Sequence, residues 1–132
     1  MAVDIFLKLD GVKGESTDSK HEADIDGLNW SWAMSQSGTT HTGHGGGAGK
    51  VSVQSLSFSK YIDRSSPNLQ IACCNGKHFK EAVLTVRKAG EKPLEYFKLT
   101  MTDVMISSIS IGGGGSERIT EQVRSHRLRI DI

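Results

Sequence analysis

Residues 79–103 read FKEAVLTVRKAGEKPLEYFKLTMTD, and this stretch decides the fold. Each half alternates apolar with polar residues and is rich in β-branched and aromatic side chains, which is typical of a β-strand. The link between the halves, KAGEKP, holds the Gly and Pro that mark a turn. The stretch therefore predicts two antiparallel strands joined as a hairpin.

The same period of two continues on both sides of this hairpin. It predicts further strands at VDIFLKLD (3–10), LNWSWAMS (28–35), KVSVQSLSFSK (50–60), VMISSISI (104–111) and the C-terminal stretch that contains Leu128, Ile130 and Ile132. In the first strand Phe6 falls in the polar phase, opposite Ile5 and Leu7. Within residues 50–60 the apolar phase changes between Val53 and Leu56, which predicts a β-bulge.

One helix is predicted within SSPNLQIACCNGK, residues 65–77. Ser65 or Ser66 suits the N-cap, Pro67 the first turn and Gly76 the C-terminal stop. The helix is too short to be stable alone, so it should pack on the sheet or close one end of it. About seven strands and this helix predict a mainly β fold. We expect a small antiparallel β-barrel or two-sheet sandwich with one short flanking helix and an extended glycine-rich loop.

The bulk properties fit one domain over residues 1–132, with two prolines and a net charge of +1. So small a charge gives no reason to expect nucleic acid as a partner. No apolar run approaches the roughly 20 residues that a membrane span needs. The N-terminus, MAVDIFLKLDG, lacks the basic region and cleavage pattern of a signal peptide, so we expect synthesis and folding in the cytoplasm.

The run HTGHGGGAGK at residues 41–50 ends in Gly-Lys, as a phosphate-binding loop does. That loop requires a glycine where His44 stands and Ser or Thr where Val51 stands. It also opens a helix, whereas the residues after Lys50 predict a strand. A flexible loop between two strands fits better.

The sequence also lacks the patterns of other catalytic sites and of metal sites. His41 and His44 would give a metal two ligands where zinc needs three or four, and Cys73 and Cys74 are adjacent rather than spaced for a metal. No G-x-S-x-G nucleophile elbow is present. We therefore predict no enzyme, no catalytic or metal residues and no cofactor.

The more informative feature is a strand face that is small and polar rather than charged. Asn29, Ser31 and Ala33 alternate with two tryptophans, and serines recur at alternating positions in the strands that follow. One interpretation is an ordinary solvated sheet. The other is a surface that lines a water-filled space or meets another copy of the chain.

Several long motifs resemble one known family. They are AVDIFLKLDGVKGES (2–16), IDGLNWSWAMSQSGTTH (25–41), GHGGGAGKVSVQSLSFSKYID (43–63) and SSPNLQIACCNGKHFKEAVLTVRKAGEKPLEYFKLTMTDVMISSIS (65–110). Residues 1–123 resemble the Hcp family, the haemolysin-coregulated proteins that form the inner tube of bacterial type VI secretion systems. The resemblance implies a β-barrel protein without catalysis that assembles into hexameric rings with an open centre. Such rings stack into a tube that a contractile sheath propels out of the cell behind a spike protein.

The resemblance also implies roles for particular residues. The loop after the second strand would contact the neighbouring ring through Gly43, His44, Gly45, Gly46, Gly47, Ala48, Gly49 and Lys50. Asn29, Ser31 and Ala33 would line the lumen, with cargo contacts centred on Ser31. The alternative function is a ring-shaped carrier that binds small effector proteins in its lumen. In either case the protein would be made in the cytoplasm and then secreted without a signal peptide, with no membrane insertion.

The C-terminal stretch departs from the family. Thr120–Val123 match its T-E-x-V motif, but Ser125 and Arg127 stand where apolar residues are expected. A change of reading frame, a natural truncation and an engineered end all remain open. So do three outcomes for the barrel: it stays open, it takes residues 128–132 as a substitute strand, or it pairs with a neighbour. The nearby cations, Arg124, Arg127 and Arg129, fit either an acidic partner or a solvated sheet edge.

Overall fold

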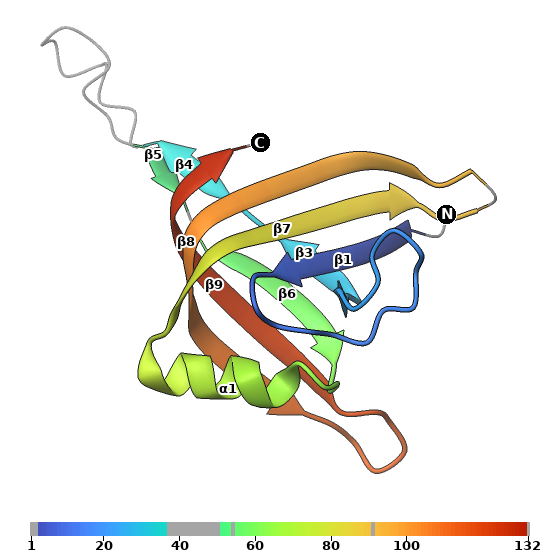
Figure 1. The fold of residues 1–132 in the computed structure, drawn as a ribbon. Coiled ribbons are helices and arrows are strands. Elements are labelled where there is room, and N and C mark those ends of the chain that lie inside the picture. The colour runs from blue at the N-terminus through green and yellow to red at the C-terminus, as the bar shows by residue number, and fades with distance from the viewer. Residues whose placement is uncertain (1–2, 37–50, 54, 91, 132) are drawn as a thin grey trace, which may run out of the picture.

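The computed structural model describes residues 3–36, 51–53, 55–90 and 92–131 (Figure 1). The elements in chain order are β1 (Val3–Leu9), β2 (Ile25–Asp26), β3 (Asn29–Ser31), β4 (Met34–Gln36), β5 (Val51–Val53), β6 (Leu56–Tyr61), α1 (Ser66–Asn75), β7 (His78–Lys88), β8 (Leu94–Gly112) and β9 (Thr120–Asp131). Seven strands form one sheet in the order β2-β1-β7-β8-β9-β6-β3, while β4 and β5 form a separate two-stranded ribbon. All of these pairings are antiparallel. The expected mainly β fold with one short flanking helix is confirmed.

The hairpin predicted at residues 79–103 is confirmed as β7 and β8. Two strands were predicted at 94–103 and 104–111, but β8 is one strand of 19 residues. Asp103 has a positive φ of 56°, so the strand bends at this residue without ending. Because β8 is so long, its first part pairs with β7 and its second part with β9.

The two outer strands of the sheet are held together by one segment of chain. β2 pairs with β1, and three residues later β3 pairs with β6. Between them the Gly27 N–H donates to the Ile5 carbonyl at 2.9 Å, and the Leu28 N–H donates to the Ser59 carbonyl at 2.7 Å. A Cβ on Gly27 would lie 2.5 Å from Cζ of Phe58, so only glycine fits here. The sheet thus curls into a barrel without a continuous closing ladder.

Two expectations about the middle strands are wrong. Residues 28–35 do not form one strand, because β3 belongs to the main sheet and β4 to the ribbon. The phase change between Val53 and Leu56 is not a bulge in one strand, since β5 and β6 lie in different sheets. The apolar face of this region is only partly covered: Trp30 and Trp32 pack against the core, while Leu28 is 43% exposed.

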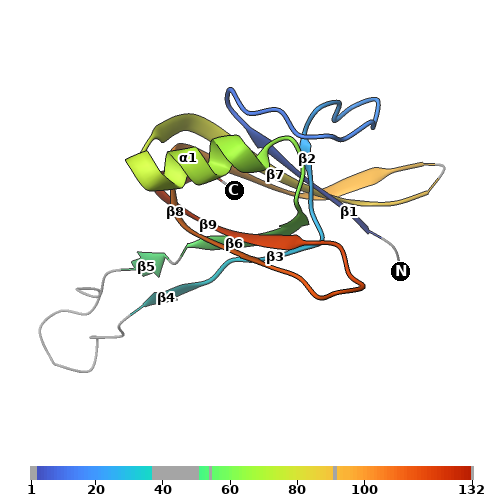
Figure 2. The same ribbon diagram turned by 90° about the horizontal axis from the view of Figure 1, so that it is seen from below.

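The predicted helix is confirmed as α1. Gly76 ends it in the left-handed conformation, with φ of 67°. Leu69 and Ala72 are buried and pack in the core, Cys73 is half-buried and Cys74 is exposed. Figure 2 shows α1 and β3 on opposite sides of the molecule, so the helix covers the side away from β3.

The C-terminal stretch, which was expected to depart from the family, continues as strand. β9 runs to Asp131 and pairs with β8 as far as Thr100. Of the three outcomes left open by the sequence, the chain therefore adopts the substitute strand over the described residues. The edge of β8 next to β9 is paired along this length, which removes an edge that would invite aggregation.

Candidate assembly surface

The outward side of β3, β6, β9 and the second part of β8 carries two rows of small polar side chains. Cross-strand partners point to the same side of a sheet, so the pairing register defines the rows. The first row is Asn29, Ser59, Gln122 and Ser110, and the second is Ser31, Ser57, Arg124 and Ser108. We call these eight residues the serine face.

The serine face lies opposite the core. Its members on β3, β8 and β9 are exposed, and the two serines on β6 are half-buried. The alternate residues Phe58 and Val123 point inward and are 2% exposed. Ala33 is also exposed, just beyond the end of β3. The outward position of Asn29, Ser31 and Ala33 is therefore confirmed, while their contact with a lumen or cargo stays a prediction.

The chemistry of the serine face is unusual for a protein surface. Surfaces commonly mix acidic and basic side chains. The two rows contain hydroxyls, amides and a single charged group, the guanidinium of Arg124. A β-bulge in β8 lies beside it between Ile106 and Ser108, and the Ser107 hydroxyl donates to the Arg124 carbonyl at 3.1 Å.

A buried ion pair joins β6 to β9 behind this face. Lys60 Nζ lies 2.7 Å from Glu121 Oε1, and neither side chain is exposed. Lys60 also donates to the Ser66 hydroxyl at 2.9 Å and to Asp63 Oδ1 at 3.0 Å. Gln70 donates to the second oxygen of Glu121 at 3.2 Å. The network fixes the start of α1 to the strands that carry the serine face.

A pocket at one end of the barrel combines apolar and charged groups. It is lined by Glu15, Asp26, Leu28, Ile62 and Arg118, among others. Leu28 and Ile62 are 43% and 36% exposed. The pKa of Asp26 is raised above its usual value, first by burial and then by neighbouring carboxylates. Such a mixture suits a contact with another protein surface rather than with water alone.

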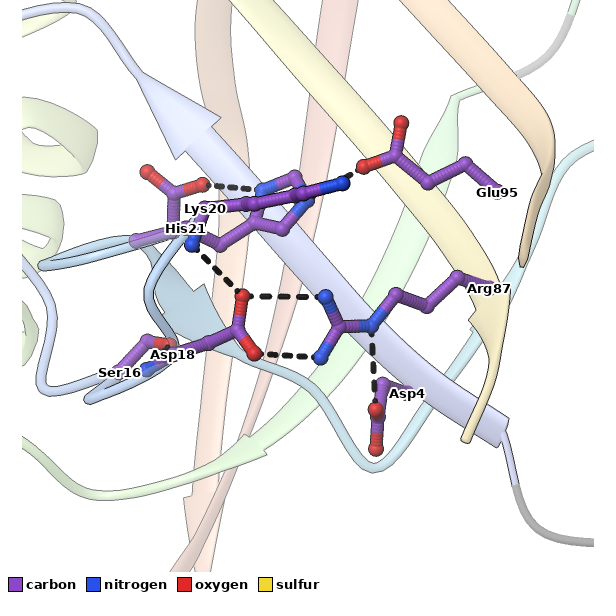
Figure 3. A network of polar contacts seen from close by, with 8 residues as sticks. Asp4, Ser16, Asp18, Lys20, His21, Arg87 and Glu95 are labelled. Atoms are coloured by element: carbon purple, nitrogen blue, oxygen red, sulfur yellow. Dashed lines mark hydrogen bonds and ion pairs between the residues drawn. The ribbon is translucent and has the colours of Figure 1, made fainter. Parts of the chain in front are cut away.

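The segment between β1 and β2 covers the outer side of β1 and β7 (Figure 3). The His21 ring stacks on Phe6 at 4.4 Å between centroids, so Phe6 is buried rather than on a polar face as the alternation suggested. Arg87 donates to Asp18 Oδ2 at 3.0 Å and to Asp4 at 3.2 Å. Figure 3 shows the Asp18 carboxylate and the Arg87 guanidinium facing each other side by side.

Charged contacts also hold this covering segment in place. The hydrogen bond from Arg87 holds the pKa of Asp18 below its usual value, and Asp18 in turn raises the pKa of Arg87. The His21 ring nitrogens lie 2.9 Å from Asp24 and 2.7 Å from Glu95. The contacts of Asp18 with Arg87 and of His21 with Glu95 have no periodic signature in the sequence, because each joins a turn to a strand more than 60 residues away.

The glycine loop expected to contact a neighbouring ring, Gly43–Lys50, lies outside the described residues. The ribbon strands β4 and β5 flank that part of the chain. Within the part of the chain that the structure describes, no three His, Cys, Asp or Glu side chains gather as a metal site. In the same residues no helix is long and apolar enough to cross a membrane.

The chain is similar to one family and to several solved structures. A family model described as "Type VI secretion system effector, Hcp" matches residues 6–129. Protein hcp1 of Pseudomonas aeruginosa is 55% identical over 134 residues, which cover 100% of this chain and 83% of that protein. The crystal structure of Hcp1 from Salmonella typhimurium is 43% identical with a TM-score of 0.81, over 96% of this chain and 82% of that chain. A type VI secretion system effector from Yersinia pestis is 36% identical with a TM-score of 0.82, over 96% and 86% of the two chains.

Proposed function

Because this chain belongs to the Hcp family and is a component of the bacterial type VI secretion system, we propose that it forms hexameric rings that stack into the secreted inner tube. The family consists of secreted structural components rather than enzymes, which agrees with the chemistry expected from the sequence. The observation that carries the proposal is the serine face. It is exposed, almost uncharged and built on paired strands, as the wall of a water-filled channel should be.

Short hydroxyl side chains suit such a wall for a physical reason. They stay hydrated, yet they make few strong contacts with anything that moves past them. A wall of mixed charges would bind passing proteins at many points, and an apolar wall would bind them more firmly still. We place Asn29, Ser31 and Ala33 at this wall.

A ring needs two different surfaces on each copy, because its contacts run head to tail. Exposed apolar side chains at two separate places support this arrangement. One set, with Leu28 and Ile62, lies at the pocket described above. The other, with Leu94 and Tyr96, lies on the hairpin of β7 and β8 and is 56% and 53% exposed. Contacts between rings would involve residues 43–50, where glycines permit close approach of two backbones.

The second candidate function is a carrier in which a free ring holds a small effector protein. Ser31 favours it, because this exposed side chain belongs to the serine face on its outermost strand, β3. The two functions differ in the form that acts, since the carrier needs a single ring and the tube needs the stack. In both, one domain spanning residues 1–132 would be made in the cytoplasm and leave through the secretion apparatus, with sheath and spike proteins as partners.

Electron microscopy of the purified chain tests the proposal. Rings with six-fold symmetry and an open centre, stacking into tubes at high concentration, are expected. Monomers or closed particles without a central opening would contradict it. For the carrier function, Ser31→Trp should release a bound effector while rings persist, and Lys98→Trp on the opposite part of β8 is the control. Unchanged effector binding by the Ser31 variant would overturn the lumen assignment.

A further inference from the structure

Arg124 is the one charged residue of the serine face, and neither the tube function nor the carrier function accounts for its charge. We propose that Arg124 makes this face selective for acidic proteins, so that the cargo admitted to the ring carries a negatively charged surface. The inference rests on the proposed lumen position of the face and names the class of partner that it takes.

Arg124 occupies a central place on the serine face. It lies on β9, between β6 and β8, and its register partners are Ser57 and Ser108. Gln122, two residues earlier on the same side of the strand, is also exposed. Among the members of the serine face, Arg124 is therefore flanked by uncharged side chains that are shorter than its own.

Carboxylates that would neutralise Arg124 are directed elsewhere. The preceding acidic residue of β9, Glu121, points into the core and is bound to Lys60. The two rows of the serine face contain no carboxylate. Among the described residues, Arg124 forms no recorded ion pair, whereas Arg87 on the other side of the barrel forms two. The charge of Arg124 thus remains available to a partner.

The local geometry favours recognition of a carboxylate. A guanidinium presents a planar fork of donors that binds a carboxylate through two hydrogen bonds. The neighbouring serine hydroxyls can donate to the same partner. The bond from Ser107 to the Arg124 carbonyl fixes the backbone at the bulge, which reduces the ordering that binding requires.

Assembly into a ring would strengthen the attraction of acidic partners, because it brings several copies of Arg124 together. A closed ring repeats each position, so the Arg124 side chains would form a belt of cations around the opening. The fields of like charges in a narrow channel add, and they raise the local concentration of anionic partners.

The experiment measures fluorescence anisotropy of two labelled 20-residue peptides, one alternating Glu with Ser and one alternating Lys with Ser. Each is titrated with the full chain in its assembled state, checked by sedimentation. We expect the Glu peptide to bind, the Lys peptide not to bind, and added salt to weaken the complex. Arg124→Gln should weaken binding of the Glu peptide about tenfold, as the loss of one charge-assisted contact implies. The affinity of Arg124→Lys for the Glu peptide should lie between those of the parent and of Arg124→Gln, because lysine keeps the charge but lacks the planar fork of donors.

Lys98→Gln is the matched control. It removes one positive charge from an exposed site on β8, ten residues before Ser108, the register partner of Arg124. Binding within twofold of the parent is expected. Equal affinity of the Arg124→Gln variant and the parent for the Glu peptide, or no preference for it over the Lys peptide, would overturn the inference. If the inference about Arg124 is overturned in this way but rings form, the proposed tube function still stands. If no ring forms but binding depends on Arg124, the selectivity for acidic partners is supported and the ring is contradicted.

Discussion

The ammonium of Lys60 lies 2.7 Å from a carboxylate oxygen of Glu121, and both side chains are fully buried. Their residues are register partners on β6 and β9. Ser66 and Gln70 of the helix bind the same carboxylate, at 3.0 and 3.2 Å. The pair therefore couples β6, β9 and α1 at one end of the barrel.

Removing either partner of this pair should destabilise the protein more than removing both. Lys60→Met or Glu121→Leu would leave an uncompensated group in the core, at a cost of about 3–5 kcal/mol. The double variant Lys60→Met/Glu121→Leu should recover most of that loss, because two apolar side chains replace the pair. Urea unfolding of the four proteins measures the coupling. Additive effects of the two single changes would show that the pair is not coupled.

Gly27 should be intolerant of any side chain. Alanine at this position would bring its methyl group within 2.5 Å of the Phe58 ring and 3.0 Å of Ile5. Either the ring or the segment joining β2 to β3 must move, so we expect a loss of about 1–3 kcal/mol, as overpacking of a core usually costs. The measurement is thermal unfolding of Gly27→Ala, with Gly112→Ala as control because nothing lies within 4 Å of its added methyl group. Equal melting temperatures for the two variants would contradict the proposed closure.

The Asp18–Arg87 pair should make the covering segment sensitive to acid. Because its folded pKa is lowered below the ordinary 3.8, Asp18 contributes stability that is complete above that value and lost as the pH falls through the folded pKa. Asp18→Asn should therefore reduce stability at pH 7, and its difference from the parent should shrink as the pH falls below 3.8 toward the folded pKa. Unfolding measured at a series of pH values from 7 downward tests this.

Hydrogen exchange localises the same effect. At neutral pH the Asp18→Asn variant should lose protection at Gly14 and Ser16, whose N–H groups donate to carbonyls within the covering segment. The control Asp10→Asn changes an exposed carboxylate at the end of β1 and should leave protection unchanged. Loss of protection spread evenly over the barrel would show that Asp18 acts on global stability rather than on this segment.

The alternation of apolar and polar residues, together with turn and cap residues, predicted the elements that depend on residues close in sequence. The hairpin of β7 and β8 followed from its alternation and turn residues, and α1 from Pro67 and Gly76. The outward position of Asn29 and Ser31 followed from the same alternation. These elements depend on neighbours in sequence, which is the information that a periodic pattern contains.

Other features depend on contacts between distant parts of the chain. Phe6 is buried on the side expected to be polar, because the segment between β1 and β2 folds back over it. Lys60 and Glu121 look like surface residues in sequence, yet the start of α1 buries them together. The continuous apolar alternation at 28–35 hid the division between β3 and β4, which belong to different sheets.

The mass of the assembled protein in solution tests the central claim most directly. Sedimentation velocity over a range of protein concentrations should give a species of six times the 14.3 kDa chain, with larger stacks as the concentration rises. That result would place the serine face in a ring built by this chain, including its C-terminal strand β9. A species that stays at the mass of one or two chains at every concentration would contradict the ring, and with it the tube.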